Sequence, residues 1–169
     1  MAKEYGVTVN RIRKEATKVR KAMNGNVTLE AIVAYIKQTG HGIVYFNIPW
    51  GDEELRRYDL VDTAKTKKGF VYHQIAQIVF IDDTLPHTDK IRVLLHELGH
   101  IVLGHIDEGV FALKDHGIQE LEAHTFARMM LDGGHMTTDN HWFAITAMIC
   151  VVMLAGLKLS IVKGGATNG

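Results

Sequence analysis

The chain has 169 residues, which is enough for one domain with a hydrophobic core. Its 19 Lys and Arg residues balance its 19 Asp and Glu residues, so no strong overall charge favours nucleic acid, and we expect no direct binding to it. The single cysteine, Cys150, excludes an intramolecular disulfide and gives no sign of an oxidising compartment.

The first predicted element is an amphipathic helix over residues 9–23, within a basic N-terminal segment, 1–26. Its apolar residues recur at spacings of three and four, which is the pattern of one helix face. They are Val9, Ile12, Ala16, Val19 and Met23. The favoured interpretation is that this face packs on the core. The alternative is that the Lys- and Arg-rich faces dock a substrate or an acidic membrane surface.

Residues 27–134 predict a mainly helical α+β domain with a small antiparallel sheet. Thr28 is expected to cap the first helix of this domain and Gly40 to end it, and Thr88 is expected to cap a later helix. The predicted elements are a helix between Thr28 and Gly40, strand 43–48, a short helical piece and loop over 52–69, strands 70–72 and 77–81, and helices 89–104 and 118–131.

An apolar segment near the C-terminus, residues 141–162, predicts one more helix. Trp142 to Leu157 contains no charged residue, and the whole segment as a helix is about 30 Å long, the thickness of a hydrocarbon core. The favoured interpretation is a C-terminal membrane anchor, and the alternative is a buried terminal helix of a soluble protein. Because the first residues lack the apolar stretch of a signal peptide, we expect the domain over residues 27–134 to lie in the cytoplasm.

His96-Glu97-Leu98-Gly99-His100 is an H-E-x-x-H motif in a strongly helical, apolar stretch. Residues four apart share a helix face, so the two imidazoles can bind one ion. Glu97 lies beside them, placed to take a proton from a metal-bound water. With ten histidines in the chain, a chance match is a real alternative. Two buried histidines with a carboxylate between them are, however, hard to satisfy without an ion, so the motif predicts a zinc site.

Zinc needs a third protein ligand, and Glu122 is the predicted one. It shares one face of helix 118–131 with three apolar residues, so its carboxylate is expected to be buried and to need a cation. Those residues are Ile118, Phe126 and Met129. A metal ion meets this need, and the alternative is an ion pair with a basic residue from elsewhere in the chain.

Two other residues near the motif are not expected to bind the metal. His105 follows His100 by five residues, whereas the third histidine of the metzincin pattern lies six after the second. Glu120 is assigned to another face of its helix, where solvent can satisfy its charge. Neither residue therefore replaces Glu122 in the predicted ligand set.

The stretches LLHELGHIVLGH and QELEAHTFARMML together resemble the ImmA/IrrE family of metallo-endopeptidases, which has H-E-x-x-H on one helix and E-A-x-x-F-A on the next. The likeness covers about residues 28–131. It implies a gluzincin-type site in which His96, His100 and Glu122 bind Zn²⁺ and Glu97 is the general base. One departure is His124, at a position where the family often has Asn or Asp.

The resemblance implies a zinc-dependent metallo-endopeptidase that hydrolyses peptide bonds in a protein substrate. It suggests a helix-turn-helix repressor of a mobile element or stress response as the substrate class. The reaction also needs a hydrogen-bond donor to the oxyanion, and Tyr72 and His73 are the two candidates for this role. Two alternatives stay open: a non-catalytic zinc-binding protein that regulates a partner by contact, and a small membrane protein whose histidines are structural.

Overall fold

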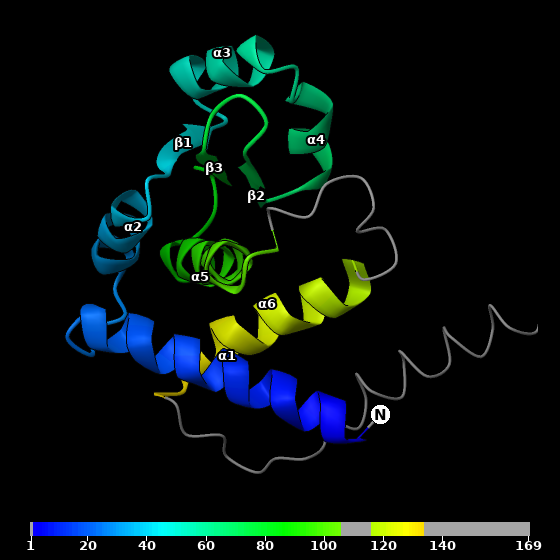
Figure 1. Cartoon of the computed structure of the whole chain (residues 1–169). Coiled ribbons are helices and arrows are strands. Elements are labelled where there is room, and N and C mark those ends of the chain that lie inside the picture. The colour runs from blue at the N-terminus through cyan, green and yellow to red at the C-terminus, as the bar shows by residue number, and fades with distance from the viewer. Residues whose placement is uncertain (1, 106–115, 134–169) are drawn as a thin grey trace, which may run out of the picture. The chain divides into compact units, whose positions relative to one another are not determined.

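The computed structural model of the chain describes residues 2–105 and 116–133, so the predicted apolar helix 141–162 lies outside the described residues. The described part is mainly helical with a three-stranded sheet, which confirms the predicted α+β class (Figure 1). Its elements are α1 (Ala2–Ala22), α2 (Leu29–Gln38), β1 (Gly42–Phe46), α3 (Pro49–Arg57), α4 (Val61–Thr66), β2 (Gly69–Tyr72), β3 (Ile78–Asp82), α5 (His87–Leu103) and α6 (His116–Leu131). Within these ranges, none of the helices is both long and apolar enough to cross a membrane.

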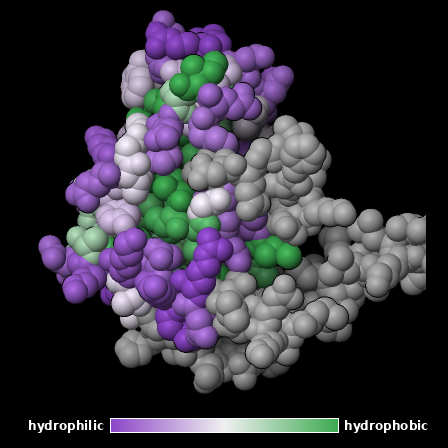
Figure 2. Space-filling view, viewed as in Figure 1, coloured by the Kyte–Doolittle hydropathy of each residue, from purple (hydrophilic) through white to green (hydrophobic). Residues whose placement is uncertain are grey.

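Helix α1 packs its apolar face on the core, as the favoured interpretation predicted. Four of the five predicted apolar positions are buried, and Figure 2 shows mainly hydrophilic residues along the outward side of the helix. Arg11 donates a hydrogen bond to the carbonyl of Leu103, and Arg20 donates one to the carbonyl of Met130. These carbonyls lie at the C-terminal ends of α5 and α6, where positive charge is favourable. Helix α1 therefore holds the ends of both later helices.

The sheet is mixed, so the prediction of a wholly antiparallel sheet is wrong. Its strand order is β1-β3-β2, in which β2 pairs antiparallel with β3, as predicted, but β1 pairs parallel with it. The chain between β1 and β3 contains α3, α4 and β2, which is long enough for the crossover that a parallel pair needs. The central strand is buried along its whole length, which explains its unbroken apolar run.

Helix boundaries depart from the prediction where proline begins a helix. Helix α3 begins at Pro49, before the helical piece expected from residue 52, because a proline in the first turn loses no helical hydrogen bond. Helix α5 likewise begins at His87 after Pro86, so Thr88 lies inside its first turn instead of capping it. The other predicted cap is confirmed, because the Thr28 side chain accepts a hydrogen bond from the amide of Ala31 at 3.2 Å.

The strands place different side chains on the two faces of the sheet. Phe70 and Tyr72 pack with the residues of α3 and α4, and the ring of Tyr72 lies 5.1 Å from that of Tyr58. Gly69 belongs to the other face, because a Cβ there would come within 2.4 Å of Val93 on α5. Side chains alternate along a strand, so Tyr72 points away from α5.

Helices α5 and α6 touch through two small residues, Gly99 and Ala123. A Cβ added at Gly99 would lie 3.0 Å from the Cα of Ala123 and 3.3 Å from the ring of Phe126. Glycine inside a helix costs up to about 1 kcal/mol relative to alanine, so it needs a compensating reason. Here that reason is the close approach of α6, which brings side chains from the two helices together.

Gly99→Ala is expected to lower the free energy of unfolding by about 1 kcal/mol or more, because the added methyl meets backbone atoms that must move. Gly117→Ala is the matched control, since a Cβ at that position of α6 meets nothing within 4 Å. That variant should gain up to about 1 kcal/mol from helix propensity. Urea unfolding of both measures the difference. Equal gains in the two variants would contradict a close contact at Gly99.

Asp82 ties the end of β3 to the neighbouring segments. Its buried carboxylate accepts hydrogen bonds from the side chains of Asn47, Lys68 and Thr84, at 2.8, 3.1 and 2.6 Å, and one from the amide of Thr84. Burial alone raises the pKa of Asp82, but these bonds outweigh it and lower the pKa to about 2. The network fixes the start of β2, which lies against α5.

Because its pKa falls on folding, Asp82 stabilises the fold above pH 4, and this contribution is lost as the pH falls from about 4 to about 2. Over that range the wild-type chain should lose about 2 kcal/mol that Asp82→Asn does not lose. Asp59→Asn removes the same charge from an exposed site and should follow the wild type. Urea unfolding between pH 5 and pH 2 tests this, and parallel curves for wild type and Asp82→Asn would refute it.

Candidate metal centre

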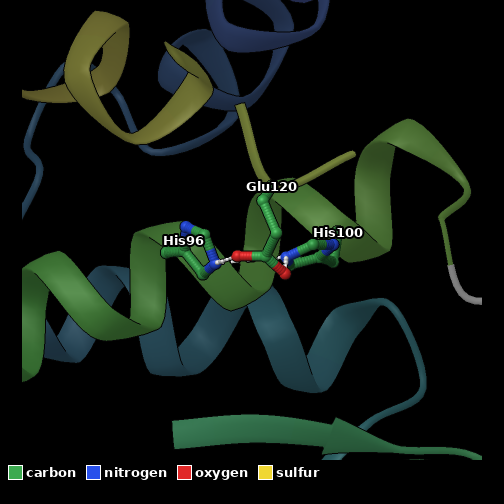
Figure 3. Close-up of side chains that lie close together, drawn as sticks. All are labelled: His96, His100 and Glu120. Carbon is green, nitrogen blue, oxygen red and sulfur yellow. Dashed lines mark hydrogen bonds and ion pairs between the residues drawn. The ribbon is translucent and has the colours of Figure 1, made fainter. Parts of the chain in front are cut away.

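Two histidines of α5 and a glutamate of α6 point toward one another across the helix contact (Figure 3). Nε2 of His96 and Nε2 of His100 are 3.1 Å apart. Each faces one oxygen of Glu120, at 3.3 Å from His96 and 3.4 Å from His100. Among the described residues these three are the group able to hold a metal ion, since their ligand atoms all lie within 4.8 Å of one another.

The spacing of these three donors fits zinc. Bonds of 2.0–2.2 Å in a tetrahedron put neighbouring donor atoms about 3.3–3.6 Å apart, close to the observed separations. Two imidazoles and one carboxylate are also a ligand set that zinc uses when it keeps a fourth position for water. The side chain of Glu120 is 37% exposed, so the cluster is open on that side.

The electrostatic setting of the histidines favours a metal over a proton. Burial lowers the pKa of His96, and His124 lowers it further, although Glu120 opposes both effects. Burial, with the neighbouring His96, lowers the pKa of His100 to about 4. Both imidazoles are therefore neutral near pH 7, and a neutral imidazole is the form that binds a metal.

The structure does not bring Glu122, the predicted third ligand, to the two motif histidines. Its Oε2 lies 2.8 Å from Nε2 of His105, and that pair is largely buried. The partner of the Glu122 carboxylate in the structure is thus the imidazole of His105. The prediction assumed a buried face that includes Ile118, but Ile118 is 57% exposed. Glu120, assigned to solvent from the sequence, is the carboxylate that faces the histidines.

Glu97 is buried beside the cluster, next to the edge strand β2. A Cβ on Gly69 would lie 3.7 Å from its Cγ, so β2 covers this carboxyl. Burial raises the pKa of Glu97 to about 8, although Lys67 favours its charged form. A carboxyl whose pKa lies this near neutrality can both take up and release a proton at physiological pH.

Lys67, which no sequence motif marks, acts on the site, whereas Tyr72, an expected oxyanion donor, lies away from it. Lys67 is an exposed cation just before β2, and its charge acts on Glu97 and on both motif histidines. Tyr72 packs on the far face of the sheet, and His73 is exposed beyond the end of β2. Tyr72 is therefore not placed to act as an oxyanion donor. The position of Lys67 depends on the path of the backbone just before β2, which sequence spacing does not define.

His124 lies against the outer side of the cluster. Its ring centroid is 4.3 Å from that of His96, and its own side chain is exposed. Nδ1 of His96 is buried and has no hydrogen-bond partner among the residues that the structure describes. The two motif histidines thus differ, because Nδ1 of His100 lies 3.1 Å from Nδ1 of His105.

Comparison with known proteins supports the metallopeptidase interpretation of this site. Residues 37–136 match the Peptidase_M78 family, described as the IrrE N-terminal-like domain. The match covers more than half of the chain and includes the sheet, α5 and α6. No curated protein matches the chain, and neither does any solved structure. The chain therefore belongs to the Peptidase_M78 family, and residues 37–136 form its metallopeptidase-like, IrrE N-terminal-like domain.

Proposed function

We propose that the chain is a zinc-dependent endopeptidase in which His96, His100 and Glu120 hold zinc and Glu97 is the general base. The observation that carries this proposal is the convergence of two imidazole nitrogens, 3.1 Å apart, on one carboxylate, whose two oxygens lie 3.3 and 3.4 Å from them, beside a buried carboxyl. When bound, zinc lowers the pKa of water toward neutrality and polarises a peptide carbonyl. The family to which the chain belongs supports the same reaction class.

Glu97 carries the proton transfers of the proposed reaction. It accepts the proton of the attacking water and returns it to the leaving amine. Its place between the cluster and β2 keeps it out of bulk water, and the nearby charge of Lys67 favours its ionised, proton-accepting form. Lys67 also offers a positive charge for the negative charge that develops on the carbonyl oxygen.

The proposed substrate is another protein, with a helix-turn-helix repressor as the class suggested by the resemblance to ImmA/IrrE proteins. The exposed side of Glu120 leaves the cluster open to a large substrate. Within the described residues, β2 is an edge strand that runs beside Glu97, and an extended peptide can add to such an edge through main-chain hydrogen bonds. A membrane anchor at 141–162 stays a prediction.

The second proposed function is a zinc-binding regulator that acts by contact without cleavage. The observation that favours it is His124, which packs on the ligand His96 at a position where similar proteins often have Asn or Asp. Such a change beside a ligand alters its surroundings without removing the metal site. Both functions share the same zinc site, so they differ only in turnover.

Glu97→Gln separates the two functions. It keeps the shape of the side chain but removes the base, so peptide cleavage should fall by about 100-fold or more while zinc stays bound. The assay incubates the full-length chain with a helix-turn-helix repressor as the candidate substrate and reads fragment masses, with a chelator control. Glu53→Gln, at an exposed position of α3, is the matched control and should cleave normally. Cleavage that survives in Glu97→Gln would exclude this mechanism, and no cleavage by the wild type would favour the regulator.

Glu120→Gln and Glu122→Gln compare the two carboxylates of α6 directly. Loss of a ligand should weaken zinc binding by about 100-fold or more, whereas a change outside the ligand set costs about 10-fold or less when a hydrogen-bond acceptor is kept. Glu120→Gln is therefore expected to bind zinc far more weakly than Glu122→Gln. Competition with a chromophoric chelator measures both constants. The reverse order would restore Glu122 as the third ligand.

A further inference from the structure

Glu122 and His105 form a buried polar chain that ends at His100. Nε2 of His105 lies 2.8 Å from Oε2 of Glu122, and Nδ1 of His105 lies 3.1 Å from Nδ1 of His100. The side chains of His105 and Glu122 are only 6% and 13% exposed. The far ring nitrogen of His100, Nε2, is the atom that faces Glu120 and His96.

The direction of the two hydrogen bonds that join Glu122, His105 and His100 depends on the charge of His105. An ionised carboxylate can only accept hydrogen bonds, so Nε2 of His105 must carry a proton and donate it to Glu122. A neutral His105 then has a bare Nδ1, which accepts the proton of Nδ1 of His100. His100 is left with a lone pair on Nε2, directed into the cluster. A charged His105 would reverse this order, because it would donate from both nitrogens and put the proton of His100 on Nε2.

We propose that Glu122 and His105 are positioning residues that hold His100 in the tautomer with its proton on Nδ1 and its Nε2 free for the metal. The inference rests on the proposed function in that the metal ligand being positioned is His100. Histidine ligands commonly donate their second ring proton to a carboxylate or a carbonyl, which fixes the ring and its tautomer. Here the hydrogen bond from Nδ1 of His100 goes to a second imidazole, His105, which in turn donates to the carboxylate of Glu122.

The connected side chains of Glu122, His105 and His100 also account for two features that the proposed ligand set does not use. Glu122 is a largely buried carboxylate outside the donor cluster, and such a group needs a partner to offset its desolvation. The second feature is the position of His105 directly after the end of α5. Gly104, with a left-handed φ of 73°, ends that helix and turns the backbone before His105. One helix end thus presents the imidazole that connects the two helices.

The tautomers are read from two-bond ¹H–¹⁵N spectra of the ¹⁵N-labelled, full-length chain without metal at pH 7.5. Signals are assigned by comparison with His100→Gln and His105→Gln. We expect the proton on Nδ1 for His100 and on Nε2 for His105. A proton on Nε2 of His100, or a charged His105, would overturn the inference. Because no metal is present, this result stands apart from the proposed function, which fails if the wild-type chain binds no zinc.

Zinc affinity gives the second readout, again by chelator competition. Glu122→Leu removes the acceptor and should weaken zinc binding about 10- to 100-fold, whereas Glu122→Gln keeps an acceptor oxygen and should lose less. If both residues act through one chain, Glu122→Leu with His105→Leu should bind no more weakly than His105→Leu alone. Wild-type affinity in Glu122→Leu, or additive losses, would overturn the inference. If the leucine variants do not fold, the His100 tautomer in Glu122→Gln decides, and it must stay as in the wild type.

Discussion

The close contact between α5 and α6 at Gly99 and Ala123 is the constraint on which the candidate site depends. Helices that meet through small residues bring the side chains one turn away within reach of each other. On α5, His96 lies three residues before Gly99 and His100 follows it directly, and on α6 Glu120 lies three residues before Ala123. The glycine inside the H-E-x-x-H motif is therefore a packing residue, and the proposed metal site is a consequence of how the helices cross.

The parts around this contact hold it from several sides. Arg11 and Arg20 of α1 bind the carbonyls at the C-terminal ends of α5 and α6, so a helix outside the family match fixes the helices that carry the site. Gly69 lets β2 lie against α5 and cover Glu97. The three carboxylates near the site therefore have different surroundings: Glu120 faces the motif histidines, Glu97, the proposed general base, is buried beside β2, and Glu122 lies against His105.

Hydrophobic periodicity and local signals predicted much of the fold. The apolar face of α1, the Thr28 cap and the antiparallel pair of β2 and β3 depend on neighbouring residues, so the sequence shows them directly. The parallel pairing of β1 depends on a crossover, which no local pattern encodes. The histidine pair followed from helix spacing alone. The carboxylate that faces this pair did not, because whether Glu120 or Glu122 does so depends on which face of α6 meets α5. Ala123 was the available signal, since a small residue marks a close contact and Glu120 lies three residues before it.

The most direct test of the proposed metal centre is an anomalous-scattering map from crystals of the full-length chain grown with zinc. We expect one strong peak between α5 and α6, about 2.0–2.2 Å from Nε2 of His96, Nε2 of His100 and one oxygen of Glu120. A peak bonded to Glu122 instead, or no peak at the two motif histidines, would contradict it.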